Sequence, residues 1–283
     1  MKAIYAATGA AAILCGFPAA AQEAGESDTT NDAYEGSVFD GDWLSVGAGA
    51  VYGPSYDGSD DYVFSPIPIV QGSLGGVGIN PRAGGLALDF IPDADGEVAF
   101  SAGIAAKLNR NRASQIEDPV VESYGKLDTA FEVGPSAGVS FPGLLNEYDS
   151  LSFNLDALWD VAGAHRGMTV NPAITYFTPL SRGMAVSLSV SATHVDDDYA
   201  DYYYSVPAGG PLPAFQADGG FESVGATLFG AIDLDGDVTN GGLAIIALGG
   251  YSRMLGDAKR SPFTAIRGDA DQWMGALGFG YTF

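Results

Sequence analysis

The residues with the clearest capacity for chemistry in this sequence are its two histidines, His165 and His194. Ser191 lies three residues before His194, and a serine beside a histidine base is the arrangement that activates a hydroxyl nucleophile. Both histidines lie at predicted strand ends, however, and an offset of three along a strand places two side chains on opposite faces. The pair therefore cannot form locally, and we expect no enzymatic activity.

Carboxylates offer a second kind of chemistry, because clustered oxygen ligands can hold Ca²⁺ or Mg²⁺ and bridge to lipopolysaccharide phosphates. No cluster follows the spaced ligand pattern of a calcium loop, and the Asp-Leu-Asp-Gly-Asp stretch at 233–237 is typical of a hairpin turn. The sequence favours a solvated acidic rim, with no metal and no cofactor. The acidic clusters are Asp57, Asp60 and Asp61; Glu117, Asp118 and Glu122; and Asp196, Asp197, Asp198 and Asp201.

The overall charge narrows the classes of partner. A formal net charge of −23 argues against nucleic acid as a ligand, because phosphates and the chain would repel one another. The chain is nevertheless 47% hydrophobic with 40 glycines, which is not the composition of a disordered acidic protein. The acidic and apolar residues must therefore lie in separate places.

The N-terminus predicts export. Residues 1–21 combine Lys2, a short apolar stretch and an Ala-Ala-Ala end, which is typical of a cleaved signal peptide. The one cysteine, Cys15, lies inside this segment, so the mature protein would have no disulfide. Residues 22–41 are polar, acidic and aperiodic, and they predict a flexible periplasmic lead-in.

From residue 42 onward the apolar residues recur with period two. Segments of this kind are about ten residues or longer, which matches a tilted strand that crosses a bilayer, and no later window has the apolar length of a membrane helix. In 149–163, one face carries Leu151, Phe153, Leu155, Ala157, Trp159 and Val161, and the other carries Ser152, Asn154, Asp156 and Asp160.

About twelve such strands are predicted, near 43–53, 64–73, 75–80, 84–91, 97–108, 127–141, 149–162, 167–178, 181–195, 220–234, 239–253 and 269–283. Long connections follow odd-numbered strands only, as in an up-and-down barrel with both termini in the periplasm. A β-sandwich is the alternative, but the polar face is made of small residues, as in a solvated lumen. Residues 42–283 therefore predict an all-β, antiparallel transmembrane β-barrel in the outer membrane of a Gram-negative cell.

The predicted lumen carries a few larger polar side chains: Lys107, Glu132, Asn154, Asp156 and Asp160. They could line a cation-preferring pore, or they could hydrogen-bond across the interior and close it. Aromatic residues near strand ends suit the interfacial girdles of a barrel, at Trp43, Tyr52, Phe141, Phe177, Tyr251 and Trp273.

The last strand ends on an aromatic residue. Trp273, Leu277, Phe279, Tyr281 and Phe283 share one face and small residues share the other. This pattern is similar to the terminal signal by which outer-membrane barrels are recognised by their assembly machinery.

Three further stretches resemble the MltA-interacting protein family, also called MipA/OmpV. They are YDGSDDYVFSPIPIVQG at 56–72, HVDDDYADYYYSV at 194–206 and GGYSRMLGDAKRSP at 249–262. The resemblance implies an outer-membrane barrel in contact with lipid and lipopolysaccharide. It also implies a structural or scaffold role that joins a lytic transglycosylase to a penicillin-binding protein in peptidoglycan synthesis.

Two other roles stay open beside the scaffold. The barrel could be a passive small-solute channel that prefers cations, or a surface adhesin or antigen that acts through its acidic outer loops. A scaffold needs a periplasmic contact surface, and the predicted short turn at 142–149 offers Leu144 and Leu145.

Overall fold

The computed structural model describes residues 37–91, 98–146 and 148–283. The predicted signal peptide at 1–21 and most of the predicted lead-in lie outside these residues. The end of the lead-in belongs to the ordered body, because Val38–Asp40 forms a short 3-10 helix, η1, capped by Ser37. The Phe39 ring packs edge-on against Trp43, with 4.8 Å between ring centroids.

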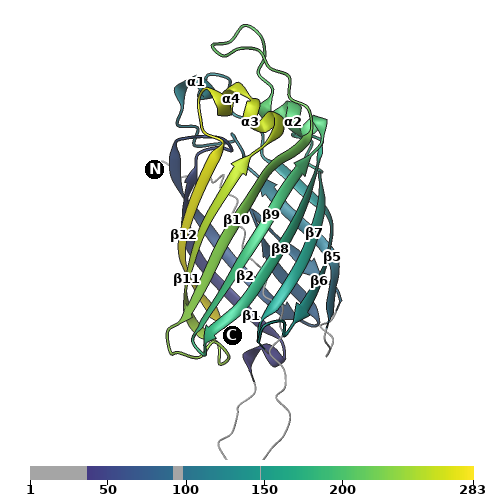
Figure 1. Cartoon of the computed structure of the whole chain (residues 1–283), viewed down its shortest axis with the longest axis vertical. Helices are drawn as coiled ribbons and strands as arrows, with labels where there is room; N and C mark the ends of the chain where they lie inside the picture. The colour runs from purple at the N-terminus through teal and green to yellow at the C-terminus, as the bar shows by residue number, and fades with distance from the viewer. Residues whose placement is uncertain (1–36, 92–97, 147) are drawn as a thin grey trace, which may run out of the picture.

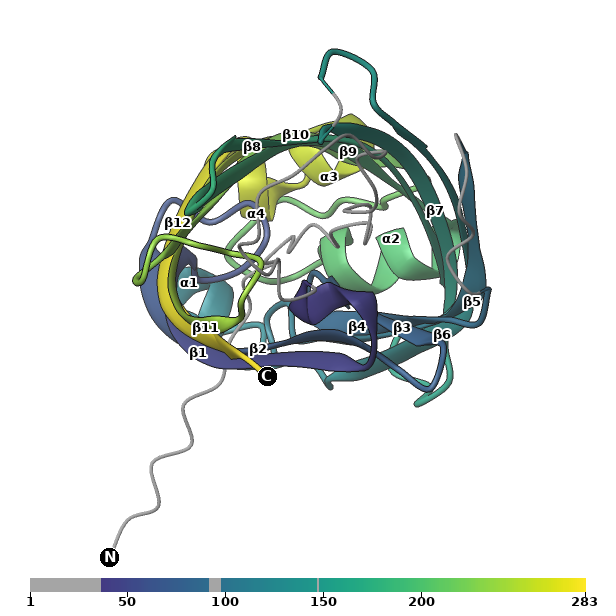
Figure 2. The ribbon, with the colours of Figure 1, turned by 90° about the horizontal axis from the view of Figure 1, so that it is seen from below.

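Twelve antiparallel strands form a closed barrel within the described residues, as predicted (Figure 1). They are β1 (Trp43–Pro54), β2 (Tyr62–Leu74), β3 (Val77–Arg82), β4 (Gly85–Asp89), β5 (Ala99–Asn109), β6 (Ala130–Pro142), β7 (Ser150–Asp160), β8 (Met168–Ser181), β9 (Met184–Val195), β10 (Gly220–Asp233), β11 (Gly242–Met254) and β12 (Asp271–Thr282). Each strand pairs with the next in sequence, and β12 closes the ring against β1 (Figure 2). No helix among the described residues is long and apolar enough to cross a membrane.

The closing pair runs from Ser45 opposite Thr282 to Tyr52 opposite Gly275. The Phe283 N–H donates to the Leu44 carbonyl at 3.0 Å, so hydrogen bonding extends to the last residue of the chain. Closure leaves no free edge between the first and last strands, which removes a site of aggregation.

Alternation sorts the side chains between the lipid-facing and lumen-facing sides of the wall. Large apolar residues such as Phe100, Leu228 and Leu277 are more than half exposed on the outer side. Serines and threonines such as Ser187, Ser189 and Thr227 are buried on the inner side. Trp43 departs from the predicted girdle, because its position in β1 turns it inward, where it is 6% exposed.

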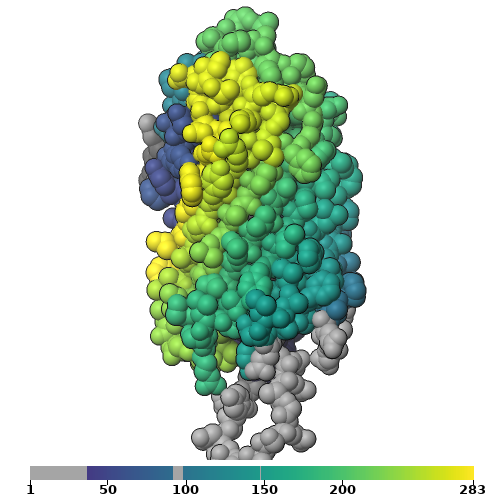
Figure 3. All heavy atoms as spheres, viewed as in Figure 1, coloured from purple at the N-terminus to yellow at the C-terminus, as the bar shows by residue number. Residues whose placement is uncertain are grey.

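The two ends of the barrel differ. Four short helices gather at one end (Figure 1), and Figure 3 shows them massed with their loops above the strands. They are α1 (Pro119–Glu122), α2 (Asp197–Tyr204), α3 (Gly256–Arg260) and α4 (Pro262–Ala265). Phe283 and the short turns lie at the opposite end. We call the connections 55–61, 110–129, 196–219 and 255–270 the cap.

Candidate functional site

The helix α2 fills much of the capped end of the barrel. The Asp196 carboxylate accepts the Tyr199 N–H at 3.0 Å and so begins the helix. A spacing of four residues places Tyr199 and Tyr203 on one face, and these two residues and Tyr204 are no more than 2% exposed. A second cluster around Tyr56 and Phe263 packs beside it. The predicted acidic outer loop at 196–219 therefore contributes a buried apolar core.

Glu132 is the centre of a polar network beneath this core. Its carboxylate is 0% exposed and accepts hydrogen bonds from Asn109 Nδ2 at 3.0 Å and Thr169 Oγ1 at 3.3 Å. The Lys107 ammonium lies 3.2 Å from Oε2. A buried carboxylate is stable only with such partners, so these contacts compensate its loss of water.

His165 approaches the same carboxylate from the β7–β8 loop. The Gly167 N–H donates to its Nδ1 at 3.0 Å, which leaves the proton of a neutral ring on Nε2. Nε2 lies 3.4 Å from Glu132 Oε1, and the ring packs against Tyr199 with 4.9 Å between centroids. His165 is thus a neighbour of Glu132 and Tyr199.

The network continues across the lumen through Tyr199. Its hydroxyl accepts from Asn109 Nδ2 at 3.1 Å and donates to Glu222 Oε1 at 3.2 Å. Tyr204 also donates to Glu222. Burial raises the pKa of the Tyr199 and Tyr204 phenols well above the usual value, so both stay protonated donors. Side chains from β5, β6, β10 and the cap are joined in this way.

Arg112 fixes the β5–β6 loop of the cap against α2 and α4. Its guanidinium lies 4.0 Å from the centroid of the Phe263 ring and donates from Nη1 to the Tyr203 carbonyl at 3.1 Å. Burial lowers its pKa to about 10, so the group remains charged at neutral pH. The loop is therefore held by a buried cation, a feature that the sequence alone did not indicate.

A cavity of about 600 Å³ lies in the lumen next to this network. Its lining combines apolar with polar and charged side chains, and Lys107, Tyr199 and Glu222 belong to both the lining and the network. In the wall, Arg82 Nε donates to Asp156 Oδ2 at 2.7 Å. Other polar lining residues are Asn154, Asn171, Thr175, Ser189, Ser191, Thr193, Thr227, Ser252 and Gln272.

The predicted lumen residues separate into three environments. Lys107 and Glu132 belong to the network, while Asn154 and Asp156 line the cavity. Asp160 differs, because its carboxylate accepts the backbone N–H groups of the β7–β8 loop, His165 and Arg166 among them, at 2.9 and 3.0 Å. It stabilises a turn and does not line the cavity.

Ser191 and His194 do not meet. Ser191 lines the cavity, whereas the His194 ring packs against Phe221, which is 56% exposed on the outer side. The opposite-face geometry expected from their offset is therefore what the strand adopts.

Several acidic residues of the loops and turns have structural partners. Asp118 accepts two N–H groups at the start of α1 and pairs with Arg267, while Asp233 accepts three N–H groups of the β10–β11 turn. Asp197 accepts the Gly219 N–H at 2.8 Å. Among residues 37–91, 98–146 and 148–283, no three acidic, histidine or cysteine side chains converge as metal ligands would.

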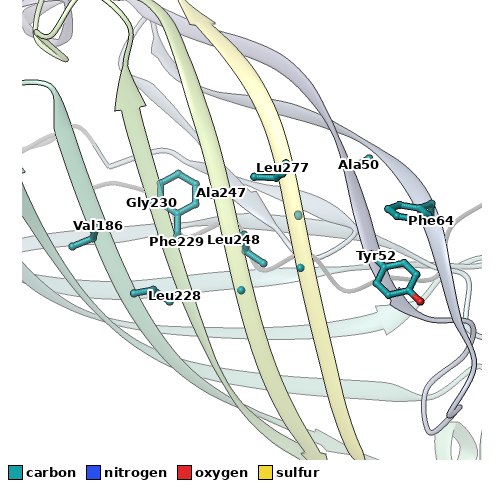
Figure 4. A pocket seen from close by; sticks show the side chains of 13 residues that line it. Ala50, Tyr52, Phe64, Val186, Leu228, Phe229, Gly230, Ala247, Leu248 and Leu277 are labelled. Atoms are coloured by element: carbon teal, nitrogen blue, oxygen red, sulfur yellow. The ribbon is translucent and has the colours of Figure 1, made fainter.

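A second hollow, of about 710 Å³, lies on the outer face across β9 to β12, β1 and β2 (Figure 4). Leu228, Leu277, Tyr52 and Phe64 border it. Glycines and alanines face outward between them, which leaves the surface shallowly indented. Its lining is almost wholly apolar, as expected for a surface that hydrocarbon covers.

The two faces of the terminal strand also separate as expected. Trp273, Leu277, Phe279, Tyr281 and Phe283 are 45–67% exposed on the outer side. At the uncapped end, Leu144 and Leu145 are 51% and 83% exposed in the β6–β7 turn.

A closed, even-stranded antiparallel barrel with an apolar outer band and a polar lumen defines the class of outer-membrane β-barrel proteins. Residues 46–283 match the profile of one family, described as MltA-interacting protein MipA. The chain belongs to this family.

Solved structures of other outer-membrane proteins have low sequence identity to this chain. An outer membrane channel from Pseudomonas putida F1 has a TM-score of 0.46 and 14% identity, over 90% of this chain and 100% of that one. The Ralstonia pickettii toluene transporter TbuX has a TM-score of 0.35 and 9% identity, over 86% and 89% of the two chains. At these scores no inference about function follows. No significant sequence match was found among curated proteins.

Proposed function

We propose that this protein is a non-enzymatic outer-membrane scaffold that binds peptidoglycan enzymes on its periplasmic side. In this proposal the uncapped end, with η1 and Phe283, faces the periplasm, and the cap faces outward. The family's description as MltA-interacting supports a lytic transglycosylase as one partner. A penicillin-binding protein is the second proposed partner.

The observation that carries the proposal is the apolar β6–β7 turn at the uncapped end. The Asp149 carboxylate accepts the N–H groups of Leu144 at 2.7 Å and Leu145 at 2.9 Å, and the Tyr176 hydroxyl at 2.7 Å. The backbone is therefore fixed while both leucine side chains project into solvent. A preorganised apolar anchor of this kind is typical of a protein-binding surface, because little order is lost on binding.

The charge state of Asp149 preserves this turn at neutral pH. Burial opposes ionisation, but the Tyr176 hydroxyl and the backbone N–H groups lower the pKa of the carboxyl below its usual value. The stabilisation is present above the pKa of the unfolded chain and is lost as the pH falls through the folded value.

Replacing both Leu144 and Leu145 with serine is expected to reduce recovery of the lytic transglycosylase about tenfold, since two apolar anchors of a hot spot are removed. The measurement is cross-linking in intact cells, followed by purification of the barrel and identification of its partners. Leu234→Ser, 54% exposed in the β10–β11 turn, is the matched control. Equal recovery with the double variant would contradict the proposal.

A passive cation channel is the second candidate, and the lumen cavity, which is lined in part by charged and polar side chains, favours it. The buried tyrosines of the cap oppose it, because they pack with residues of β9, β11 and α3 at the capped end of the barrel. We expect the purified protein to give no steady conductance in planar bilayers. A variant in which 197–216 is replaced by a short glycine-serine linker should conduct; cation-selective steps from the unaltered protein would favour the channel instead.

A further inference from the structure

The wall of the barrel is incompletely paired between β2 and β3. These two fully described strands share only three residue pairs, Gly72 with Ile79, Ser73 with Gly78 and Leu74 with Val77. On its other side, β2 pairs with β1 along its length, as far as Tyr62 opposite Pro54. One edge of β2 between Tyr62 and Gln71 therefore has no strand partner. We call this edge and the facing β3–β4 hairpin the β2–β3 seam.

Prolines explain why the ladder stops. If the register continued, Val70 would oppose Pro81, but β3 ends at Arg82 and turns back into β4, where Gly85 pairs with Arg82. The Phe64 carbonyl accepts from Gln115 on the unpaired side, so even-numbered residues of β2 direct their backbone groups toward the seam. Pro66 and Pro68 of β2 and Pro81 of β3 have no N–H to donate, and β3 is too short to reach the upper part of β2, so the ladder stops.

The lumen cavity reaches this seam from the inside. Its lining includes residues from both faces of the bordering strands: Ile67 and Lys107 from the inner face, and Pro66, Pro68 and Leu108 from the outer face. The cavity therefore lies against the unpaired edge of β2 and against β5. An unpaired strand edge at membrane depth is stable only where water reaches it, and the cavity supplies that water.

The upper end of the seam has weak contacts. Ser65 Oγ lies 3.5 Å from Gln115 Oε1, and Gln115 Nε2 lies 3.5 Å from the Phe64 carbonyl, at the long limit for hydrogen bonds. The cap is joined to β2 here by long side-chain contacts instead of a strand ladder. This part of the wall can therefore widen without the loss of strand pairing.

Basic residues lie on the β3–β5 side of the cavity. Among the described residues, the lysines and arginines of the lining are Arg82 at the end of β3, Lys107 in β5, and Arg110 just after β5. Arg82 pairs with Asp156 and Lys107 pairs with Glu132. Arg110 forms no ion pair with any residue that the structure describes, so its charge is available to a ligand.

We propose that the β2–β3 seam is a lateral passage by which a single-chain anionic amphiphile enters the lumen cavity from the bilayer. Its alkyl chain lies between the apolar residues of the seam, among them Pro66, Pro68, Leu86 and Leu108. Its carboxylate or phosphate head pairs with Arg110. The passage is independent of the proposed scaffold surface, which lies at the uncapped end of the barrel.

The test uses the full mature protein in phosphatidylcholine nanodiscs and a dodecanoate that carries a photoreactive diazirine in its chain. We expect labelling of Pro66, Pro68, Leu86 and Leu108 in at least tenfold excess over Leu228, an outward residue of β10. Label spread evenly between β2–β5 and β10 would overturn the passage, because it would show contact with annular lipid alone.

Two sets of variants test separately where the alkyl chain of the amphiphile lies and where its charged head binds. Leu86→Trp should fill the seam and reduce labelling about tenfold, while Leu228→Trp, the same change on the outer face of β10, should leave it unchanged. Arg110→Gln should raise the Kd for dodecanoate about tenfold, the effect of one lost charged contact, and leave that for dodecyl maltoside unaltered. Dodecyl phosphate should compete with the probe, whereas equal competition by dodecyltrimethylammonium would overturn the anionic head.

Discussion

Glu132→Leu is expected to destabilise the barrel by about 3 kcal/mol, the lower end of the range for removing one partner of a buried ion pair. The substitution leaves the Lys107 ammonium beside an apolar side chain and removes the acceptor of Asn109 Nδ2 and Thr169 Oγ1. Lys107 is 20% exposed toward the cavity, so water offsets part of the loss and the upper end of the range is not reached. The temperature at which the folded band disappears in gel electrophoresis measures the effect.

Two controls locate this effect in the buried charge. Lys107→Met combined with Glu132→Leu should recover part of the lost stability, since the uncompensated ammonium is then absent. Glu122→Gln changes an exposed carboxylate of α1 and should shift the transition little. A single Glu132→Leu variant as stable as the unaltered protein would show that the network does not hold the cap.

Phe283→Asp is expected to reduce the assembled barrel in the outer membrane more than tenfold. Phe283 lies at the end of the barrel, where a charge on the lipid face costs only about 0–1 kcal/mol. That free energy corresponds to less than a tenfold change in equilibrium. A larger loss must therefore arise from recognition of the terminal strand by the assembly machinery.

The controls for this variant share its position or its chemistry. Leu243→Asp places the same charge on the outer face of β11, at the pair formed with Tyr281, and should assemble normally. Phe283→Tyr keeps the ring and should also assemble. The measurement is the heat-modifiable fraction of the protein in isolated outer membranes. Normal assembly of Phe283→Asp would show that the terminal aromatic residue is not a recognition signal.

Strand positions were predictable because each strand of a membrane barrel has one environment on each face. The alternation from Leu151 to Trp159 needs no knowledge of the rest of the chain, and the structure places β7 over Ser150–Asp160. The same alternation assigned Glu132 and Lys107 to the lumen side. It could not show that the two side chains meet, since that depends on the register between β5 and β6.

The cap was not predicted, although two local signals were present. Asp196 is a helix N-cap residue, and Tyr199 and Tyr203 are separated by one helical turn. The acidic residues between them favour a solvated loop when composition alone is considered. The incomplete pairing at the seam had a signal as well, in Pro66, Pro68 and Pro81, but its meaning depends on which strands are neighbours.

Asp160 illustrates the limit of alternation at strand ends. Its position in β7 continues the inward face, but the next residues turn, and their N–H groups bind the carboxylate. Asp149 and Asp233 act in the same way at other turns. Much of the chain's negative charge therefore satisfies backbone donors, a role that composition does not distinguish from a free acidic surface.

The pairing of β1 with β12 has a consequence for the timing of biogenesis. A ribosome makes β12 last, so every shorter nascent chain lacks the partner that β1 requires. Strand pairs formed before then expose two unpaired edges, which favour association between chains. The protein must therefore be kept unfolded until synthesis and export are complete, and its dwell time with periplasmic chaperones should depend on release of the twelve residues of β12, Asp271–Thr282.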